Sequence, residues 1–204
     1  MKPVYRIYAK RAFLMLQLIA GGAVATEAPV TTGAAPETGL RYWEWKSEGA
    51  LFRLTQRLPD QTRAYFMARG FDAGDANHIA ERCVFQSMFK NIADAGDTSI
   101  SIDLDSWLIR RGNDESRLLT REKWKEELQK NTVSRAAAIA LEWSLLPTRQ
   151  DYSPGDYNWG MTSYGLEPGQ IFDLEFSWER NNQVFHGTLK RVECARDIHP
   201  EPDP

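Results

Sequence analysis

The sequence predicts an α+β fold: an antiparallel β-sandwich-like domain with inserted helices and one disulfide bond. Three observations support this prediction. Several segments alternate apolar and polar residues with period two, as half-buried strands do. Other segments carry the start and stop signals of helices. Two cysteines, Cys83 and Cys194, follow an N-terminal segment that resembles an export signal. A single antiparallel sheet with helices on one face is the alternative.

The first 25 of the 204 residues have the features of a cleavable secretion signal. Four basic residues lie ahead of or beside a short apolar run, AFLMLQLIAGGAVA, which ends in the small-x-small pattern Ala23-Val24-Ala25. The run is too short to cross a bilayer, which takes about 20 apolar residues. We therefore expect cleavage after Ala25, export to the periplasm, and no transmembrane segment. An uncleaved amphipathic N-terminus is the alternative.

Two segments rich in small residues and proline flank the domain on its N-terminal and C-terminal sides. Residues 26–39, TEAPVTTGAAPETG, predict a flexible linker, and residues 196–204 predict a disordered tail. The segment between them, 40–195, has the length of a single globular domain.

Five segments alternate in the way that half-buried strands do. In chain order they are YWEWK (42–46), FRLTQRL (52–58), TSISIDLD (98–105), residues 139–145 and residues 172–179. The turn ERNNQ then leads into VFHGTLKRVEC, which predicts an antiparallel hairpin. Alternation is imperfect in the returning strand, and we expect Gly187 to mark a β-bulge there.

Helices are predicted as insertions at 59–93 and 118–131. PDQTRAYFMARG (59–70) has proline near its start and glycine just past its end, which is the expected asymmetry. TREKWKEELQK (120–130) begins at a threonine that can cap it.

The segment AGDANHIAERCVFQSMFKN (73–91) predicts a third, longer helix. Its apolar residues recur at helical spacing, and His78 falls on one stripe with Phe85 and Phe89. This placement predicts a core histidine rather than a metal ligand.

The stretch YSPGDYNWGMTSYGLEPGQ (152–170) contains two turns with Pro second and Gly third, the type II signature. One interpretation is a turn–strand–turn that joins a strand at 138–146 to one at 171–179. The other is a surface loop that binds a partner or ligand. The candidate contact residues are Tyr152, Tyr157, Trp159 and Tyr164, with Trp159 as the anchor, because interface hot spots favour Trp and Tyr.

Most of the seven tryptophans occupy apolar phases of their segments, so we expect them in the core. Trp159, in the glycine-rich stretch, and Trp124, on a charged helix, are the expected exceptions.

An even number of cysteines in an exported domain predicts a disulfide between Cys83 and Cys194, with a free reactive thiol as the alternative. No His-x-His, Met-rich or Cys-x-x-Cys motif is present. We expect no cofactor, and His186 and Met161 are the remaining candidates for a copper site.

Catalytic motifs are absent from the sequence: it has no GxSxG elbow, HExxH helix, phosphate loop or dinucleotide fingerprint. Asp103 with Asp105, and Asp173 with Glu175, share strand faces and could act as an acid–base pair. Solvent-facing strand positions produce the same pattern, and we expect no enzyme.

Without the four basic residues of the signal, the chain has 21 basic against 28 acidic residues, a net charge of −7. Such a domain does not suit nucleic acid, whose phosphates require a basic face. The predicted function is an exported, non-catalytic accessory or protein-interaction module with a protein partner in the cell envelope. A copper-type metal-binding protein and a small-ligand or glycan-binding protein are the alternatives. The oligomeric state and the partner's identity do not follow from the sequence.

Overall fold

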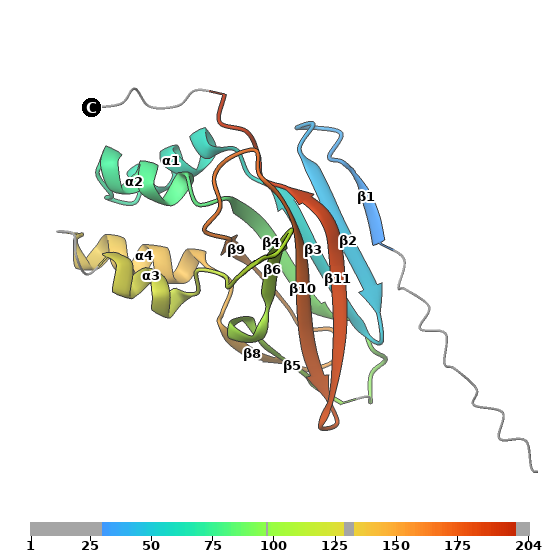
Figure 1. The fold of residues 1–204 in the computed structure, drawn as a ribbon. Coiled ribbons are helices and arrows are strands. Elements are labelled where there is room, and N and C mark those ends of the chain that lie inside the picture. Colours follow the sequence, from blue (N-terminus) through green and yellow to red (C-terminus); the bar gives the residue numbers. More distant parts are fainter. Residues whose placement is uncertain (1–29, 97, 129–132, 199–204) are drawn as a thin grey trace, which may run out of the picture.

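The computed structural model describes residues 30–96, 98–128 and 133–198, which form two antiparallel sheets with helices to one side (Figure 1). The first sheet has the strand order β1-β2-β3-β4-β9. Its strands are β1 (Val30–Ala34), β2 (Arg41–Ser47), β3 (Ala50–Gln56), β4 (Val84–Asn91) and β9 (Tyr157–Ser163). The α+β, sandwich-like fold class is confirmed.

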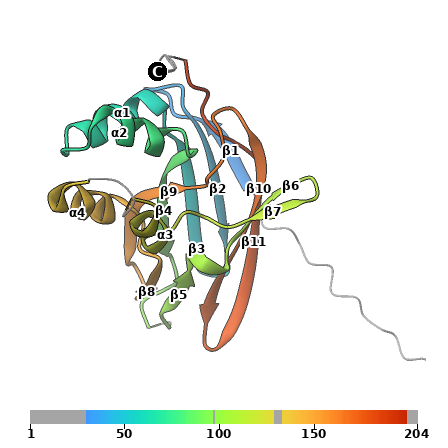
Figure 2. The ribbon, with the colours of Figure 1, turned by 60° about the vertical axis from the view of Figure 1, so that its left-hand side comes forward.

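The second sheet is centred on β10 (Ile171–Arg180), which forms a hairpin with β11 (Gln183–Glu193). Its turn residues Asn181 and Asn182 both have positive φ, of 53° and 59°, as a type I′ hairpin turn requires. The remaining strands are β5 (Ile100–Asp103), β6 (Leu108–Arg111), β7 (Asp114–Ser116) and β8 (Arg149–Tyr152). The β6–β7 hairpin projects from the body of the molecule (Figure 2). The short 3₁₀ helix η1 (Leu104–Ser106) follows β5.

Aromatic side chains from both sheets fill the space between them. Phe52 of β3 lies 4.9 Å from Trp107 and 5.0 Å from Phe176, ring centroid to ring centroid. Trp45 of β2 lies 4.7 Å from Trp178 of β10. Each is nearly or fully buried, and burial of such a side chain contributes about 1.5–3 kcal/mol. This core explains why the alternating segments 42–46, 52–58 and 172–179 are strands, although the second stops at Gln56.

Four helices lie together beside the sandwich (Figures 1 and 2). They are α1 (Pro59–Met67), α2 (Ala73–Ala80), α3 (Arg121–Leu128) and α4 (Arg135–Ser144). With the helix-side end of β4 and β9, they form a second hydrophobic cluster that includes Phe66, Trp124, Leu141 and Met161. The predicted helices at 59–70 and 120–130 are thus confirmed for the residues that the structure describes. No helix in those residues is long and apolar enough to cross a membrane.

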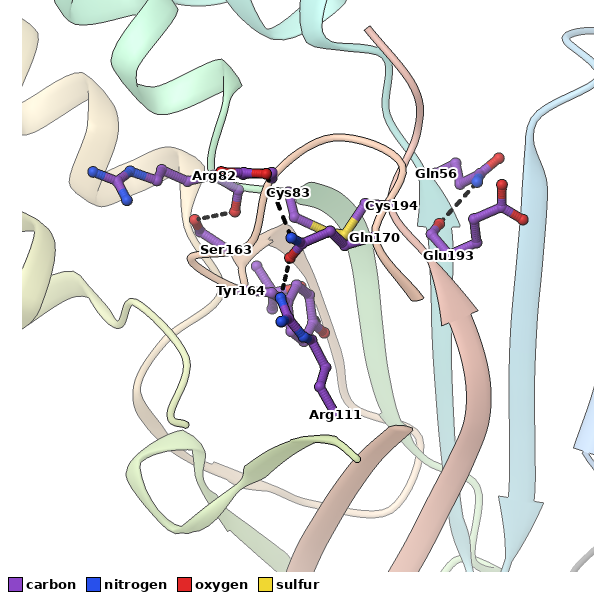
Figure 3. Close-up of a disulfide and its surroundings, with 11 residues drawn as sticks. Gln56, Arg82, Cys83, Arg111, Ser163, Tyr164, Gln170, Glu193 and Cys194 are labelled. Atoms are coloured by element: carbon purple, nitrogen blue, oxygen red, sulfur yellow. Dashed lines mark hydrogen bonds between the residues drawn. A yellow bond between two sulfur atoms is a disulfide. The ribbon is translucent and has the colours of Figure 1, made fainter. Parts of the chain in front are cut away.

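A disulfide joins Cys83, in the turn before β4, to Cys194, just after β11 (Figure 3). The two Cα atoms are 5.3 Å apart across a sequence separation of 111 residues. Neighbouring backbone bonds hold both ends: the Cys194 amide donates to the Gln170 carbonyl at 2.9 Å, and the Tyr164 amide to the Cys83 carbonyl at 3.2 Å. The predicted bridge is confirmed, and it ties the first sheet to the end of the second.

The strand prediction for 139–145 is wrong, because residues 139–144 belong to α4 and Leu145 is the C-cap of that helix. Its alternating residues fit a helix as well: Leu141 and Leu145 are one turn apart and buried, whereas Ile139 and Trp143 face solvent. Ser134 caps the helix by accepting a hydrogen bond from the Ala137 amide at 3.2 Å. The cap and the adjoining alanine run were the signals that favoured a helix.

The long helix predicted at 73–91 is also wrong in its second half. Helix α2 ends at Ala80, and β4 begins at Val84. The sequence pattern did not indicate strand β4 because polar residues occupy two of its buried, core-facing positions. Ser87 bonds the Thr162 hydroxyl at 2.6 Å, and Asn91 donates to the Tyr152 carbonyl at 2.9 Å. His78 therefore shares no helical stripe with Phe85 or Phe89.

The bulge in β11 lies elsewhere than predicted. Gly187 pairs in regular register with Phe176, and the register shifts between the pairs Phe172–Val192 and Leu174–Leu189. Arg191, inside that shift, has a φ of 53°. Gly187 instead allows the close approach of an aromatic ring, because a Cβ there would lie 2.4 Å from the Phe176 ring.

Parts of the predicted linker and tail lie within the described residues. Part of the linker 26–39 is β1, which pairs with β2 from Val30–Trp45 to Ala34–Arg41. At the other end, Asp197 forms an ion pair with the buried Arg63 of α1. The signal segment 1–25, residues 26–29 and residues 199–204 lie outside the described residues.

Candidate functional site

The stretch 152–170 forms the turn–strand–turn that its glycines predict, with β9 as the strand. Gly155 and Gly169 have φ values of 90° and 80°, and each occupies the third position of its turn. The Asp156 amide donates to the Ser153 carbonyl at 2.9 Å, and the Gln170 amide to the Glu167 carbonyl at 3.3 Å. The preceding element is the helix α4 and then β8, not the strand predicted at 138–146.

Strand β9 has one face toward the second sheet and one face away from it. Thr162 points inward, beside the core residue Phe85 with which it pairs. By alternation, Tyr157, Trp159 and Met161 point to the opposite side, which we call the outer face of the first sheet.

The outer face is divided between a covered end and an exposed end. Met161 is buried under the helices, where the Leu146 amide donates to its carbonyl at 2.8 Å. Gly160 permits this approach, since a Cβ there would lie 2.4 Å from the Leu146 nitrogen. On the N-terminal side of Gly160, Trp159 is 56% exposed and Tyr157 is 54% exposed.

Strand register extends the exposed end across four strands in two rows. One row is Trp159, Met88, Arg53 and Glu44, and the other is Tyr157, Lys90, Leu51 and Lys46. We call these eight residues the open end. Each is half-buried or exposed, and the sheet below them packs on the aromatic core. The open end is therefore a surface supported by a packed sheet, and it presents two large aromatic side chains.

The open end carries a net positive charge, although the protein as a whole carries a net negative charge. Its three cations outnumber its single carboxylate, that of Glu44, which lies 3.6 Å from Arg53. Two of the cations also lie over aromatic rings: Arg53 is 4.1 Å from the Tyr42 ring centroid, and Lys90 is 5.8 Å from that of Tyr157. Such contacts orient the charges beside the rings.

A polar hollow of about 290 Å³ adjoins Tyr157. It is lined by β8, the turn at 153–156 and the start of β9. Its amide and carboxylate side chains belong to Gln150, Asp151, Asp156 and Asn158. Asp151 accepts a hydrogen bond from the Ser101 hydroxyl at 2.6 Å, and Asp156 accepts one from the Ser153 amide at 2.9 Å.

Of the four predicted contact residues, two are buried in the core. Tyr152 and Tyr164 are each 1% exposed. Tyr164 bonds the Thr162 hydroxyl at 3.1 Å, and burial raises the pKa of both phenols above the ordinary tyrosine value. Only Tyr157 and Trp159 lie on the surface.

The tryptophans also depart from expectation. Trp124 is fully buried on the inward side of α3, whereas Trp143 is 81% exposed near the end of α4. The exposure of Trp143 was not predicted because residues 139–145 alternate with period two, which suggested that Trp143 faces the core from a strand. Trp143 and Trp159 flank the parallel bridge between Leu145 and Met161, each two residues ahead of it.

The copper candidates are far apart in the fold. Met161 is buried among the helices, and His186 is exposed on β11 of the other sheet. Within the described residues no group of three or more His, Cys, Asp or Glu side chains could hold a metal ion. His78 contacts the Glu127 carboxylate of α3 at 2.7 Å.

The suspected acid–base carboxylates are engaged in other contacts. Arg149 donates to both Asp103, at 3.0 Å, and Asp105, at 2.8 Å. Asp173 accepts from the Arg191 amide at 2.7 Å, and Glu175 pairs with Arg110 at 2.5 Å. These contacts join strands and loops at the surface.

Comparison of the chain with protein-family models, with curated proteins and with solved structures finds no match. The open end is identified by its own physical properties: exposed aromatic rings, net positive charge and a packed sheet beneath.

Proposed function

We propose that this protein is an exported, periplasmic accessory module that binds an acidic protein partner through the open end. The observation that carries the proposal is the pair Trp159 and Tyr157, each more than half exposed and held on the same face of a strand whose other face is packed in the core.

Energetics favour this pair as anchors. Tryptophan and tyrosine dominate interface hot spots, and their two side-chain torsions make them inexpensive to immobilise. The strand beneath them is bonded to β4 along its whole length. Little conformational entropy is then lost when a partner covers the rings.

Charge favours an acidic partner. The chain without its first 25 residues carries a net charge of −7, so most of its surface repels an acidic protein. The open end, with Lys46, Arg53 and Lys90 against Glu44, reverses that sign locally. Complementary charge of this kind selects partners and accelerates encounter.

The compartment is proposed from two features. The N-terminal signal pattern predicts export, and the buried bridge between Cys83 and Cys194 is typical of proteins in oxidising compartments.

The experiment that tests the partner role compares two tryptophan variants. The mature protein, Trp159→Ala and Trp143→Ala are used to capture proteins from the envelope fraction of cells that express it. A protein retained by the wild type and by Trp143→Ala is purified, and its affinity is measured by calorimetry. We expect Trp159→Ala to weaken binding at least about tenfold, as hot-spot truncation does, with unfolding free energy changed by about 0.5 kcal/mol or less.

Trp143 is the matched control because it is a more exposed tryptophan outside the open end. Binding should also fall as salt rises, and Lys90→Gln should reduce that salt dependence. Equal affinities for wild type and Trp159→Ala would contradict the proposal. So would an equal loss with Trp143→Ala, because Trp143 is not one of the eight residues of the open end.

Glycan binding is a second candidate, supported by the polar hollow next to Tyr157. An aromatic ring beside amide and carboxylate groups provides both stacking and hydrogen bonds for a sugar. Sedimentation with purified peptidoglycan separates the two functions: retention that depends on Tyr157 and on Asn158, with no captured protein, would favour the glycan.

A further inference from the structure

A cavity of about 780 Å³ lies between α3, α4 and the segment that leads into β8. None of the open-end residues lines it, although its lining residue Leu145 forms a bridge with Met161 at the covered end of β9. Its volume is in the range of small-molecule sites, about 300–1,000 Å³.

One wall of the cavity is apolar. The side chains are Leu128 of α3, Val133 ahead of α4, and Ala138, Ile139, Leu141 and Leu145 of α4 and its end. Leu128, Leu141 and Leu145 also belong to the cluster that holds the helices on the sheet. This wall is therefore part of the folded core, and Ile139, 45% exposed, extends it toward solvent.

The rest of the lining is charged and positive on balance. Four cations, Arg121, Lys125, Arg135 and Arg149, face two carboxylates, Glu122 and Glu142. The Glu122 carboxylate already accepts a hydrogen bond from the Thr148 hydroxyl at 2.5 Å. The Arg149 guanidinium already donates hydrogen bonds to Asp103 and Asp105. Among the described residues, Lys125 and Arg135 make no hydrogen bond or ion pair through their side chains.

Arg121 adds a donor that lacks an acceptor. One terminal nitrogen of its guanidinium donates to the Leu145 carbonyl at 2.6 Å. Its Nε is buried and has no hydrogen-bond partner among the described residues. A buried donor without an acceptor costs about 1–3 kcal/mol, and the Arg121 side chain that carries it lines the cavity.

We propose that this cavity binds an amphipathic anion, an aliphatic chain that ends in a carboxylate, with the chain on the apolar wall and the carboxylate among Arg121, Lys125 and Arg135. An uncharged lipid would leave the cations unpaired, and a small inorganic anion would leave the apolar wall in water. Both halves of the lining are satisfied only by a ligand that carries both properties.

The test is calorimetric titration of the mature protein with decanoate, and with decyltrimethylammonium as the ligand of the same chain and opposite charge. We expect one saturable decanoate site and no comparable heat from the cation. The variant Lys125→Gln/Arg135→Gln should bind decanoate about tenfold or more weakly, the effect of losing charged hydrogen-bond donors. Arg196→Gln, which removes an 81% exposed side chain elsewhere, should bind as the wild type does.

A second pair of variants tests the cavity without changing its charge. Ala138→Phe places a ring in the cavity and should abolish decanoate binding, whereas Ala136→Phe, at an exposed position outside the lining, should not. Absence of saturable decanoate binding to the wild type would overturn the proposal. So would equal binding of both ligands, or unchanged binding by Ala138→Phe.

Discussion

At the scale of single residues, burial separates side chains that look alike in the sequence. Tyr152, Tyr157 and Tyr164 all stand near glycines or prolines in one aromatic stretch, yet only Tyr157 is exposed. Tyr164 is held by the Thr162 hydroxyl, and the Tyr152 hydroxyl is buried with no acceptor among the described residues. Both side chains therefore pack in the core between the two sheets.

The two buried tyrosines predict a loss of stability in alkali. Burial raises their pKa in the folded protein above the unfolded value of about 10. Above that pH the unfolded state loses protons that the folded state retains, so the free energy of unfolding decreases as pH rises. The slope is about 1.4 kcal/mol per pH unit for each tyrosine. Denaturant unfolding between pH 8 and 11 measures it.

The variants Tyr152→Phe and Tyr164→Phe, combined, should flatten this pH dependence. Tyr157→Phe, at an exposed position, is the matched control. If the double variant loses stability with pH as steeply as the wild type, the phenols are not its source.

At the scale of secondary-structure elements, periodicity alone did not separate helix from strand. Residues 139–145 alternate, but they also place Leu141 and Leu145 one helical turn apart. In β4 the opposite error arose, because buried Ser87 and Asn91 interrupt the apolar alternation. Long-range hydrogen bonds make those polar core positions possible, and such bonds leave no mark in the local pattern.

Substitutions in α4 distinguish the two geometries. In a strand Ile139 and Leu141 would share a face and cost the same when truncated. In the helix Leu141→Ala should destabilise the protein by about 2–5 kcal/mol, because Leu141 is 3% exposed. Ile139→Ala should change stability by about 0.5 kcal/mol or less. Guanidinium unfolding of both variants is the measurement, and similar losses would argue against the helix.

At the scale of the whole molecule, the disulfide links the turn before β4 to the end of β11 and so joins the two sheets. Cys83 lies just ahead of the first residue of β4, whereas the open end includes Met88 and Lys90 toward the other end of that strand. Partner binding should therefore survive removal of the disulfide as long as the fold does.

Removal of the bridge in Cys83→Ala/Cys194→Ala should lower the free energy of unfolding by about 2–5 kcal/mol, measured in guanidinium. The reduced wild type should match this variant within about 1 kcal/mol. A smaller loss, below about 1 kcal/mol, would mean that the unfolded chain is constrained by other means.

The alternating strands at 42–46, 52–56 and 172–179, the hairpin, the two type II turns and the cysteine pair could be read from the sequence. Each depends on neighbours a few residues away or, for the cysteines, on their even number. What the tertiary structure alone decided is which aromatic side chains reach solvent, where β4 begins, and how the cations of α3 and α4 gather around one cavity. Exposure and clustering depend on contacts between segments far apart in the chain, as between Ser87 and Thr162, and no local pattern records them.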